Sequence, residues 1–349
     1  MAKRNLPTAP LVPLELWRAL YLAASEFQLL APWRWMDDTH VLGIDSALGV
    51  RLVSVMGNLG EVFGLVSYRG TAGTNFLLRL LRGEFAPETT EAIYHQDAVL
   101  VDFVPRKELR KPERPILQQI DFQPVASRPT RLPQFSSHKP GYLPWFIDEA
   151  EARMLLEDLP KATRFAQLLQ ANPRLFASRG KDEFPFYPPS PQEPLTPDQL
   201  QWHRLAPSAL SPDPPVDFPP AELEAMLQIP QDPASIWELA AAYSRSSISE
   251  PPRPYFSKLA LNVDAQTGLV EAFHLGGPDV SMAQTAAECL MKAIAVTDQR
   301  PASIKLASLN LSRALGPLAE ALGVRLVQAK ALPMADEALR SLHAYERGV

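Results

Sequence analysis

The chain has 349 residues, of which 46% are hydrophobic and 21% charged, and its formal net charge is -5. This length is typical of about two domains of 100–200 residues each, and a single cysteine excludes a scaffold of intrachain disulfides. No stretch approaches the ~18 consecutive apolar residues that a membrane-spanning helix needs, and the negative net charge disfavours charge-driven binding to nucleic acid.

The first predicted element is an amphipathic helix within Leu11–Leu30, with Pro13 in its first turn. Its apolar residues recur at helical spacing: Leu16, Leu20, Ala23, Phe27 and Leu30. The stretch is interrupted by Glu15, Arg18 and Glu26, so it lacks the uniform apolar region of a secretion signal. Together with the lone Cys289, this predicts a cytoplasmic location.

The N-terminal region, residues 1–172, mixes helices and strands. Asp148 and Glu151 form a capping-box pattern before a long helix that we expect to bend at Pro160 and to bury Leu155, Leu159, Phe165 and Leu169. The elements expected before it are a hairpin (49–56 and 61–68), a helix (71–81), a strand (98–104), a helix (106–119) and a strand (122–126).

The middle region, residues 173–254, is rich in proline, and 17 of the 36 prolines lie between Phe184 and Pro254. Each proline removes a backbone donor and favours extended geometry in the residue before it. The composition fits a disordered linker, yet the region also carries large aromatic residues, among them Phe184, Phe186, Tyr187, Trp202, Phe218 and Trp237. We therefore expect a segment that wraps over the domains and buries these rings, with short helices near 220–228 and 233–244.

The C-terminal region, residues 255–349, begins with a hairpin of strands 258–263 and 269–274, joined by a turn that starts at Asp264. Ser281 and Gln284 predict the start of a helix. A strand (303–307), a helix ending at Gly323 that Pro317 breaks or kinks, a strand (324–328) and a last helix (334–345) follow.

Both terminal regions thus share one predicted order of hairpin, helix, strand, helix, strand and helix. We expect an α/β (α+β) protein of two lobes, each with a mixed sheet, and the repeated order predicts one topology for both. The C-terminal order is also compatible with part of a ribonuclease H-like lobe, which is an analogy of fold alone.

Several short motifs resemble a bacterial family of proteins of unknown function. They are residues 33–38 (WRWMDD), 54–57 (SVMG), 60–65 (GEVFGL) and 140–145 (PGYLPW). The stretch 258–342 similarly resembles a companion domain of unknown function. That domain sometimes precedes a cysteine- and histidine-rich zinc tail, which this sequence lacks. The resemblance implies two domains in a bacterial cytoplasm and no particular activity.

A ribonuclease H-like nuclease holds two metal ions with acids from its first strand, a helix and the end of its central strand. Asp264 and Glu288 are the candidates for the first two places, whereas residues 308–310 (SLN) supply no acid for the third. Asp264 is also a typical hairpin-turn residue. The two acids are therefore weak catalytic candidates, and no metal site is predicted.

No other catalytic pattern is complete. Cys289 lies on the apolar stripe of its predicted helix and is expected to be an inert core thiol. The six histidines show no metal-ligand spacing, and the glycines near 57–64 surround a hairpin and do not open a phosphate-binding helix. The sequence therefore predicts no cofactor.

One group of aromatic and polar residues remains as a candidate ligand-binding surface. Trp33, Trp35, Asp37 and Asp38 follow the first helix, and His138, Tyr142 and Trp145 precede the long one. Large rigid rings suit recognition surfaces, although the same rings also serve to anchor loops to a core. We expect a non-enzymatic binding or scaffolding protein with a protein or peptide partner and no membrane or nucleic-acid role. The alternative is an active or degenerate nuclease, and the oligomeric state stays open.

Overall fold

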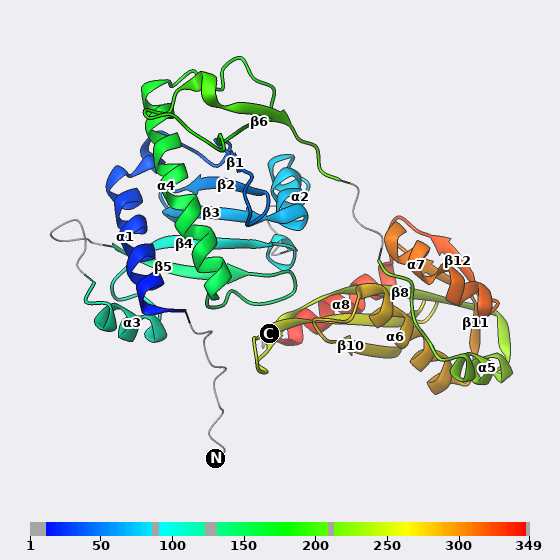
Figure 1. Ribbon diagram of the computed structural model, residues 1–349. Coiled ribbons are helices and arrows are strands. Elements are labelled where there is room, and N and C mark those ends of the chain that lie inside the picture. The colour runs from blue at the N-terminus through cyan, green and yellow to red at the C-terminus, as the bar shows by residue number, and fades with distance from the viewer. Residues whose placement is uncertain (1–11, 86–90, 123–130, 209–212, 347–349) are drawn as a thin grey trace. The chain divides into compact units, whose positions relative to one another are not determined.

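A computed structural model of the chain describes residues 12–85, 91–122, 131–208 and 213–346. The chain divides into two compact units, Met1–Ser208 (the N-terminal unit) and Ala209–Val349 (the C-terminal unit) (Figure 1). Each unit has its own mixed sheet and its own helices, so the predicted α/β class with two lobes is confirmed.

The described strands of the N-terminal unit form one seven-stranded sheet. They are β1 (Leu42–Ile44), β2 (Arg51–Met56), β3 (Gly64–Arg69), β4 (Ala98–Pro105), β5 (Arg131–His138), β6 (Glu183–Phe186) and β7 (Gln201–Arg204). Their order across the sheet is β5-β4-β3-β2-β1-β6-β7. Neighbouring strands are antiparallel except β1 and β6, which are parallel.

Helices cover both faces of this sheet (Figure 1). The larger core lies beneath α1 (Leu14–Leu30) and α4 (Glu149–Ala171), and a smaller one lies beneath α2 (Gly70–Leu81). A short helix, α3 (Arg114–Gln119), replaces the longer helix predicted over 106–119. Short 3-10 turns complete the described helices: η1 (Pro32–Arg34), η2 (Glu91–Tyr94), η3 (Lys111–Glu113) and η4 (Pro197–Gln199).

Helix α4 begins where the sequence predicted. Asp148 accepts a hydrogen bond from the Glu151 backbone N–H, and the Glu151 carboxylate accepts one from the Asp148 backbone N–H. Pro160 lies inside the continuous helix. The four core residues expected on its inner face are all buried. Asp158, also on this face, has a fully buried carboxylate that pairs with the fully buried Arg51 at 2.8 Å.

The described strands of the C-terminal unit form a five-stranded sheet. They are β8 (Gln231–Ile248), β9 (Tyr255–Asp264), β10 (Val270–Gly276), β11 (Arg300–Leu306) and β12 (Arg325–Gln328). The order is β10-β9-β8-β11-β12, with β8, β11 and β12 parallel and β9 antiparallel to its two neighbours. The first strand of the unit therefore lies at the centre of the sheet.

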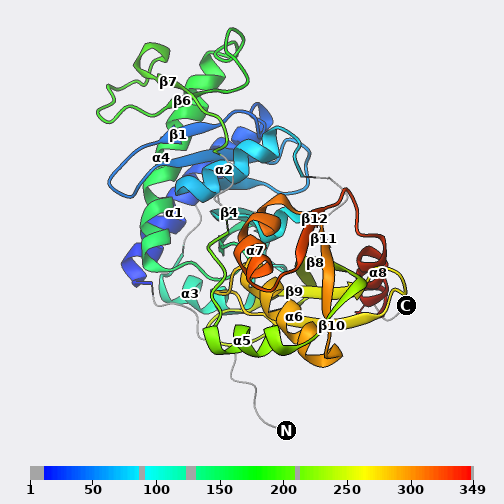
Figure 2. The same cartoon turned by 90° about the vertical axis from the view of Figure 1, so that its right-hand side faces the viewer.

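Two helix layers flank this sheet, as Figure 2 shows. One face packs against α6 (Met282–Thr297) and α7 (Leu309–Ala321), with α5 (Pro220–Gln228) beside α6. The other face packs against α8 (Pro333–Glu346). The predicted hairpin and the helix start at Ser281 are confirmed, and α7 continues through Pro317 instead of breaking there.

The proline-rich residues are divided between the two units. Strands β6 and β7 belong to the N-terminal sheet, while α5 and β8 belong to the C-terminal unit. The short helix predicted near 220–228 is confirmed, but the helix predicted near 233–244 is wrong because this stretch lies within β8. Its alanine-rich apolar run fits a buried helix and a central strand equally well by pattern, and burial on both sheet faces selects the strand.

The hypothesis of one topology repeated in both regions is wrong. In the N-terminal unit the strand after the predicted hairpin, β4, pairs directly and antiparallel with β3. In the C-terminal unit the corresponding strand, β11, pairs in parallel with β8, which has no counterpart in the predicted order. Most of the strand predicted over 122–126 lies outside the described residues.

Candidate functional site

The first group of predicted site residues lies beside the β2–β3 hairpin. The half-buried ring of Trp33 packs against Phe27, Phe63 and Phe103 at centroid distances of 5.3–6.3 Å. The Trp35 indole Nε1 donates to the Ala166 carbonyl of α4 at 3.0 Å. Both rings therefore anchor the segment that follows α1 to the core.

The two aspartates beside these rings have local partners. Asp37 Oδ1 accepts from the Thr39 backbone N–H at 2.9 Å and pairs with His40 Nδ1 at 3.0 Å. Hydrogen bonds from Thr39 and the nearby His40 hold the pKa of Asp37 below its usual value, against the effect of partial burial. Asp38 is exposed, and its carbonyl accepts from the Ser54 hydroxyl at 3.0 Å.

The second group lies where β5 ends and α4 begins. The backbones of Ser137 and Trp145 pair with each other through hydrogen bonds of 2.8 and 2.9 Å. The His138 carbonyl accepts from Arg69 Nη2 at 2.6 Å, and a ring nitrogen of His138 lies 3.3 Å from the Ser136 hydroxyl. Tyr142 is half-buried in the same loop.

The two groups of predicted residues lie near opposite ends of α4. Trp35 is bonded to Ala166, whereas Ser137, the partner of Trp145, donates its hydroxyl to Glu151. Fifteen residues of helix separate these contacts on α4, which corresponds to about 22 Å at ~1.5 Å per residue. The seven residues therefore do not form one site around a single small ligand.

The two candidate acids of the C-terminal unit are also apart. Asp264 is the last residue of β9, which is the second strand of the unit and not the first, so its predicted place in a nuclease-like set is wrong. Its Oδ1 accepts from the Gln266 and Thr267 backbone N–H groups, and these bonds lower its pKa. Glu288 pairs with His274 at 2.7 Å. His274 lies opposite Ala260, four residues along β9 from Asp264, so roughly 13 Å of strand separates the two sites.

The central strand β8 offers no acid to complete a nuclease-like set. Glu238, its one acid among the central residues, accepts the backbone N–H groups of Met334 and Ala335 at 2.9–3.0 Å, at the start of α8. Leu239 follows it, and then Ala240, Ala241 and Ala242. In the described part of the chain, no three His, Cys, Asp or Glu side chains are grouped to hold a metal ion.

A cluster of ionisable groups is buried beneath α1. Arg110 donates to Glu113 and to the Phe135 carbonyl, and Asp102 lies close enough to raise the pKa of Glu113 further. Burial is the main cause that raises the Glu113 pKa to about 7. The cluster is part of the fold rather than of an open site, since Glu113 is 2% exposed.

The most distinctive open surface is an apolar groove on the α8 face of the C-terminal sheet, with a volume of about 520 Å³. Its floor is Leu259 and Leu261 of β9, and one wall is Ala338 and Leu342 of α8. The other wall is β10, whose Val270, Phe273 and Leu275 side chains are 41%, 53% and 51% exposed. We call this feature the α8 groove.

The α8 groove was not predicted from the sequence, although the apolar pattern of residues 269–275 is a signal for it. Apolar side chains occur at almost every position of 269–275, on both faces of a strand that ends up at the edge of its sheet. Ala272 faces the core beneath α6, while Phe273 and Leu275 point to the opposite face. A hairpin strand that is solvated on one face usually alternates apolar and polar residues, so the departure indicates a second covered face.

The fold and its surfaces define a two-unit α/β protein. Residues 17–186 match the family model of a domain of unknown function, DUF7309, and residues 222–343 match that of another, DUF6930. These matches confirm the expectation of two uncharacterised domains. No curated protein matches the chain. Among the described helices, none combines the length and the apolar character needed to cross a bilayer.

Proposed function

We propose that this protein is a non-enzymatic binding protein of the bacterial cytoplasm whose α8 groove receives an amphipathic helix of a partner protein. The observation that carries the proposal is the exposure of Phe273 and Leu275 in a continuous apolar groove. Apolar patches of this kind on a soluble domain mark interaction sites more often than scattered apolar residues do.

The width of the groove favours a helix as the occupant. Helix α8 packs on β8 and β9, so it does not cover the part of the sheet face toward β10. Two neighbouring strands are together about 10 Å wide, and the axes of two packed helices lie about the same distance apart. The groove is therefore wide enough for a helix beside α8. The wall residue Ala338 is small and permits close approach by a second helix next to α8.

The edge of β10 is less suited to pairing with an added strand. Lys292 of α6 donates its Nζ to the Phe273 carbonyl at 3.1 Å, and the ammonium lies 5.0 Å from the centre of the Phe273 ring. Lysines at sheet edges are a common protection against edge-to-edge pairing. The partner is therefore expected on the face of the sheet and not along its edge.

The chemistry of the groove also fits an apolar helix face. None of the residues that line it carries a formal charge. Four serines lie toward one end, namely Ser244, Ser246, Ser247 and Ser257. Ser246 and Ser247 are exposed, and their hydroxyl groups are suited to the backbone N–H or C=O groups that a helix terminus leaves unpaired.

A titration with a labelled synthetic peptide tests the proposal on the full chain. The peptide is an amphipathic helix of about four turns with leucines at positions i, i+3, i+4 and i+7, and the control peptide has the same composition in scrambled order. Fluorescence anisotropy should show binding of the patterned peptide alone. Leu275→Asp should weaken it by about tenfold or more, because a charge is placed in the apolar contact.

Val296→Asp is the matched control, since Val296 is 67% exposed on α6, which packs on the opposite face of the sheet. It should leave binding unchanged. Equal binding of both peptides, or no effect of Leu275→Asp, would refute the proposal. Sedimentation velocity covers the other occupant: a dimer that Leu275→Asp dissociates would show that a second copy of the chain fills the groove.

A ribonuclease H-like origin of the C-terminal unit is the second candidate, and one observation favours it. Numbered within the unit, the strands lie in the order third, second, first, fourth, fifth, with the second antiparallel to the rest. This order and the helix layers on both faces support the analogy of fold. Glu288 of α6 would then be a remnant of a metal site, whereas Asp264 lies on the second strand and not on the first.

Thermal unfolding with Mg²⁺ or Mn²⁺ distinguishes the two candidates. A metal that binds only the folded protein raises its melting temperature. A rise that Asp264→Asn or Glu288→Gln abolishes, together with metal-dependent hydrolysis of nucleic acid, would support the nuclease. With the acids about 13 Å apart along the strand, we expect no rise.

A further inference from the structure

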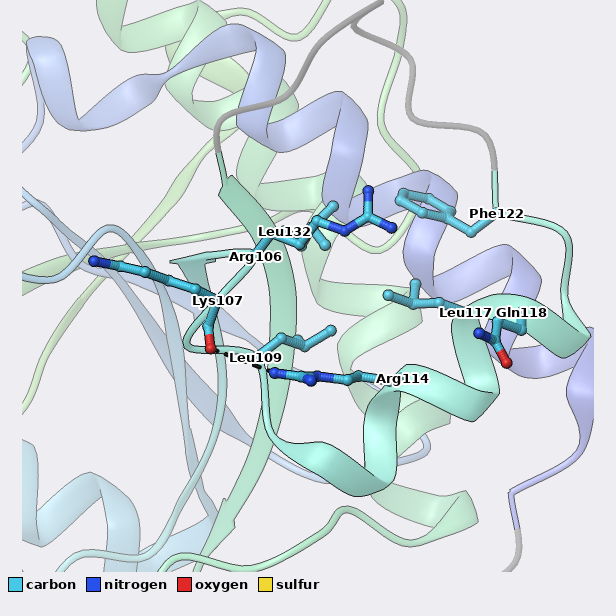
Figure 3. A pocket seen from close by; sticks show the side chains of 8 residues that line it. All are labelled: Arg106, Lys107, Leu109, Arg114, Leu117, Gln118, Phe122 and Leu132. Atoms are coloured by element: carbon cyan, nitrogen blue, oxygen red, sulfur yellow. Dashed lines mark hydrogen bonds between the residues drawn. The ribbon is translucent and has the colours of Figure 1, made fainter.

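A second open pocket lies in the N-terminal unit, between the segment that follows β4, helix α3 and the beginning of β5. Its volume is about 820 Å³. Leu109 and Leu132 are buried at its base, and Leu117 and Phe122 are half-buried at its sides. Figure 3 shows Leu117 between two arginines, with Arg106 beside Phe122 and Arg114 beside Leu109. We call this feature the arginine pocket.

The two arginines differ from the neighbouring ones in their partners. Arg110 is bonded to Glu113 and to the Phe135 carbonyl, and Arg131 donates to the Phe103 carbonyl at 3.0 Å. Arg114 donates one long bond, 3.4 Å, to the Lys107 carbonyl. Neither Arg106 nor Arg114 is paired with a carboxylate of the described residues, and both are exposed at the pocket.

This arrangement is unusual for a chain with a net charge of -5. Lys107 also borders the pocket, but its side chain extends away from the other lining residues (Figure 3) and its ammonium lies 3.9 Å from Glu108. The pocket thus presents two guanidinium groups with unused donors around an apolar base. Guanidinium groups bind carboxylates and phosphates through paired, charge-assisted hydrogen bonds.

We infer that the arginine pocket binds a small amphipathic anion, a molecule with an apolar ring or chain and a carboxylate, sulfonate or phosphate group. The leucines and Phe122 contact the apolar part, while Arg106 and Arg114 bind the anionic group. The volume lies within the ~300–1,000 Å³ that is typical of small-molecule sites. This inference is independent of the α8 groove, because it concerns the other unit.

A pair of fluorescent dyes tests the inference on the full chain. Anilinonaphthalene sulfonate has an apolar ring system and one sulfonate, and phenylnaphthylamine has the same rings without the anion. Both are titrated into the Leu275→Asp variant, so that the α8 groove contributes little to the signal. We expect the sulfonate to bind about tenfold or more tightly than the neutral dye, because it adds charge-assisted bonds.

Two variants assign the binding to the pocket. The double variant Arg106→Gln, Arg114→Gln should weaken the sulfonate by about tenfold or more and change the neutral dye by less than about twofold. Leu117→Asp should weaken both dyes. Arg82→Gln, an exposed arginine of the same unit, is the control and should change neither.

Two results would overturn the inference. One is equal affinity for the two dyes, and the other is sulfonate binding that the double glutamine variant leaves unchanged. The melting temperature of each variant is measured first, and because Arg106 and Arg114 are exposed, their replacement should not alter it. If Leu117→Asp does not fold, Leu117→Gln replaces it in the same comparison.

Discussion

Substitution of the ion pair between Arg51 and Asp158 is the strongest single test of what stabilises the N-terminal unit. Arg51 Nε lies 3.0 and 3.1 Å from the two Asp158 oxygens, and Arg51 Nη2 lies 2.8 Å from Oδ1. The Ser67 hydroxyl donates to Asp158 Oδ2 at 2.6 Å. Both charged side chains are fully buried, so the pair joins α4 to β2 in a region without water contact.

We expect Arg51→Ala to lower the free energy of unfolding by about 3–5 kcal/mol, because it leaves the Asp158 carboxylate buried without its counter-charge. This is a large part of the ~5–15 kcal/mol that stabilises a typical domain. Burial already raises the pKa of Asp158 against the opposing effect of Arg51, so loss of the arginine favours the protonated acid. The double variant Arg51→Met, Asp158→Leu should recover most of the loss.

Urea unfolding followed by tryptophan fluorescence measures this change, since five of the six tryptophans lie in the N-terminal unit. Arg153→Ala is the matched control: Arg153 pairs with Glu149 at 2.6 Å, but the two side chains are 58% and 46% exposed. Exposed pairs of this kind contribute about 0.5 kcal/mol. A loss below about 1 kcal/mol for Arg51→Ala, or one equal to that of the control, would refute the argument from burial.

Three further outcomes are expected. The folded state raises the pKa of Glu113 from 4.5 to about 7, so folding favours the neutral form of this acid. The free energy of unfolding should therefore fall by roughly 3 kcal/mol as the pH rises from 4.5 to 7. Urea unfolding across that pH range should show no such fall for Glu113→Gln. Trp35→Phe should cost about 1 kcal/mol in the same assay through loss of the bond to Ala166, and no change would contradict an anchoring role. Burial raises the pKa of Cys289 to about 12, so the folded protein should react with a thiol reagent only as fast as it unfolds.

The elements that the sequence predicted well are those specified by neighbouring residues. The capping box of Asp148 and Glu151 marks the start of α4, and Ser281 accepts from the Gln284 N–H at the start of α6. The turn at Asp264 is fixed by bonds to residues two and three positions later. Such signals depend on short stretches of chain, so they can be read without the rest of the fold.

The elements that were missed depend on distant partners. Strand β1 has three residues and pairs with β6, which lies about 140 residues later in a proline-rich stretch. The helix predicted near 233–244 lies within β8, whose strand form follows from pairing with β9 and β11. Tertiary pairing overrides local propensity in such segments.

The candidate sites also differ in whether neighbouring residues or distant partners form them. The predicted site residues are of chemical types that are common in binding sites. In the structure, however, Trp33 packs against the core and Trp35 is hydrogen-bonded to α4. The α8 groove consists of ordinary leucines, a phenylalanine and serines, and it exists only because α8 leaves part of the sheet face beside it. The apolar residues of 269–275 indicate a second covered face, but they do not show which part of the sheet α8 leaves open.

Several ionisable groups of the N-terminal unit bind one another and hold the fold together. Ionisable groups do converge beneath α4, where Arg69 binds Asp97 and Glu151, and Glu151 also accepts from the Ser137 hydroxyl. These groups bind one another, and Glu151 additionally caps its own helix, so their bonding capacity is used to position α4. A catalytic acid or base needs a lone pair or proton directed at a substrate. Arg106 and Arg114, which line the arginine pocket, are permanently charged donors that suit binding of an anion.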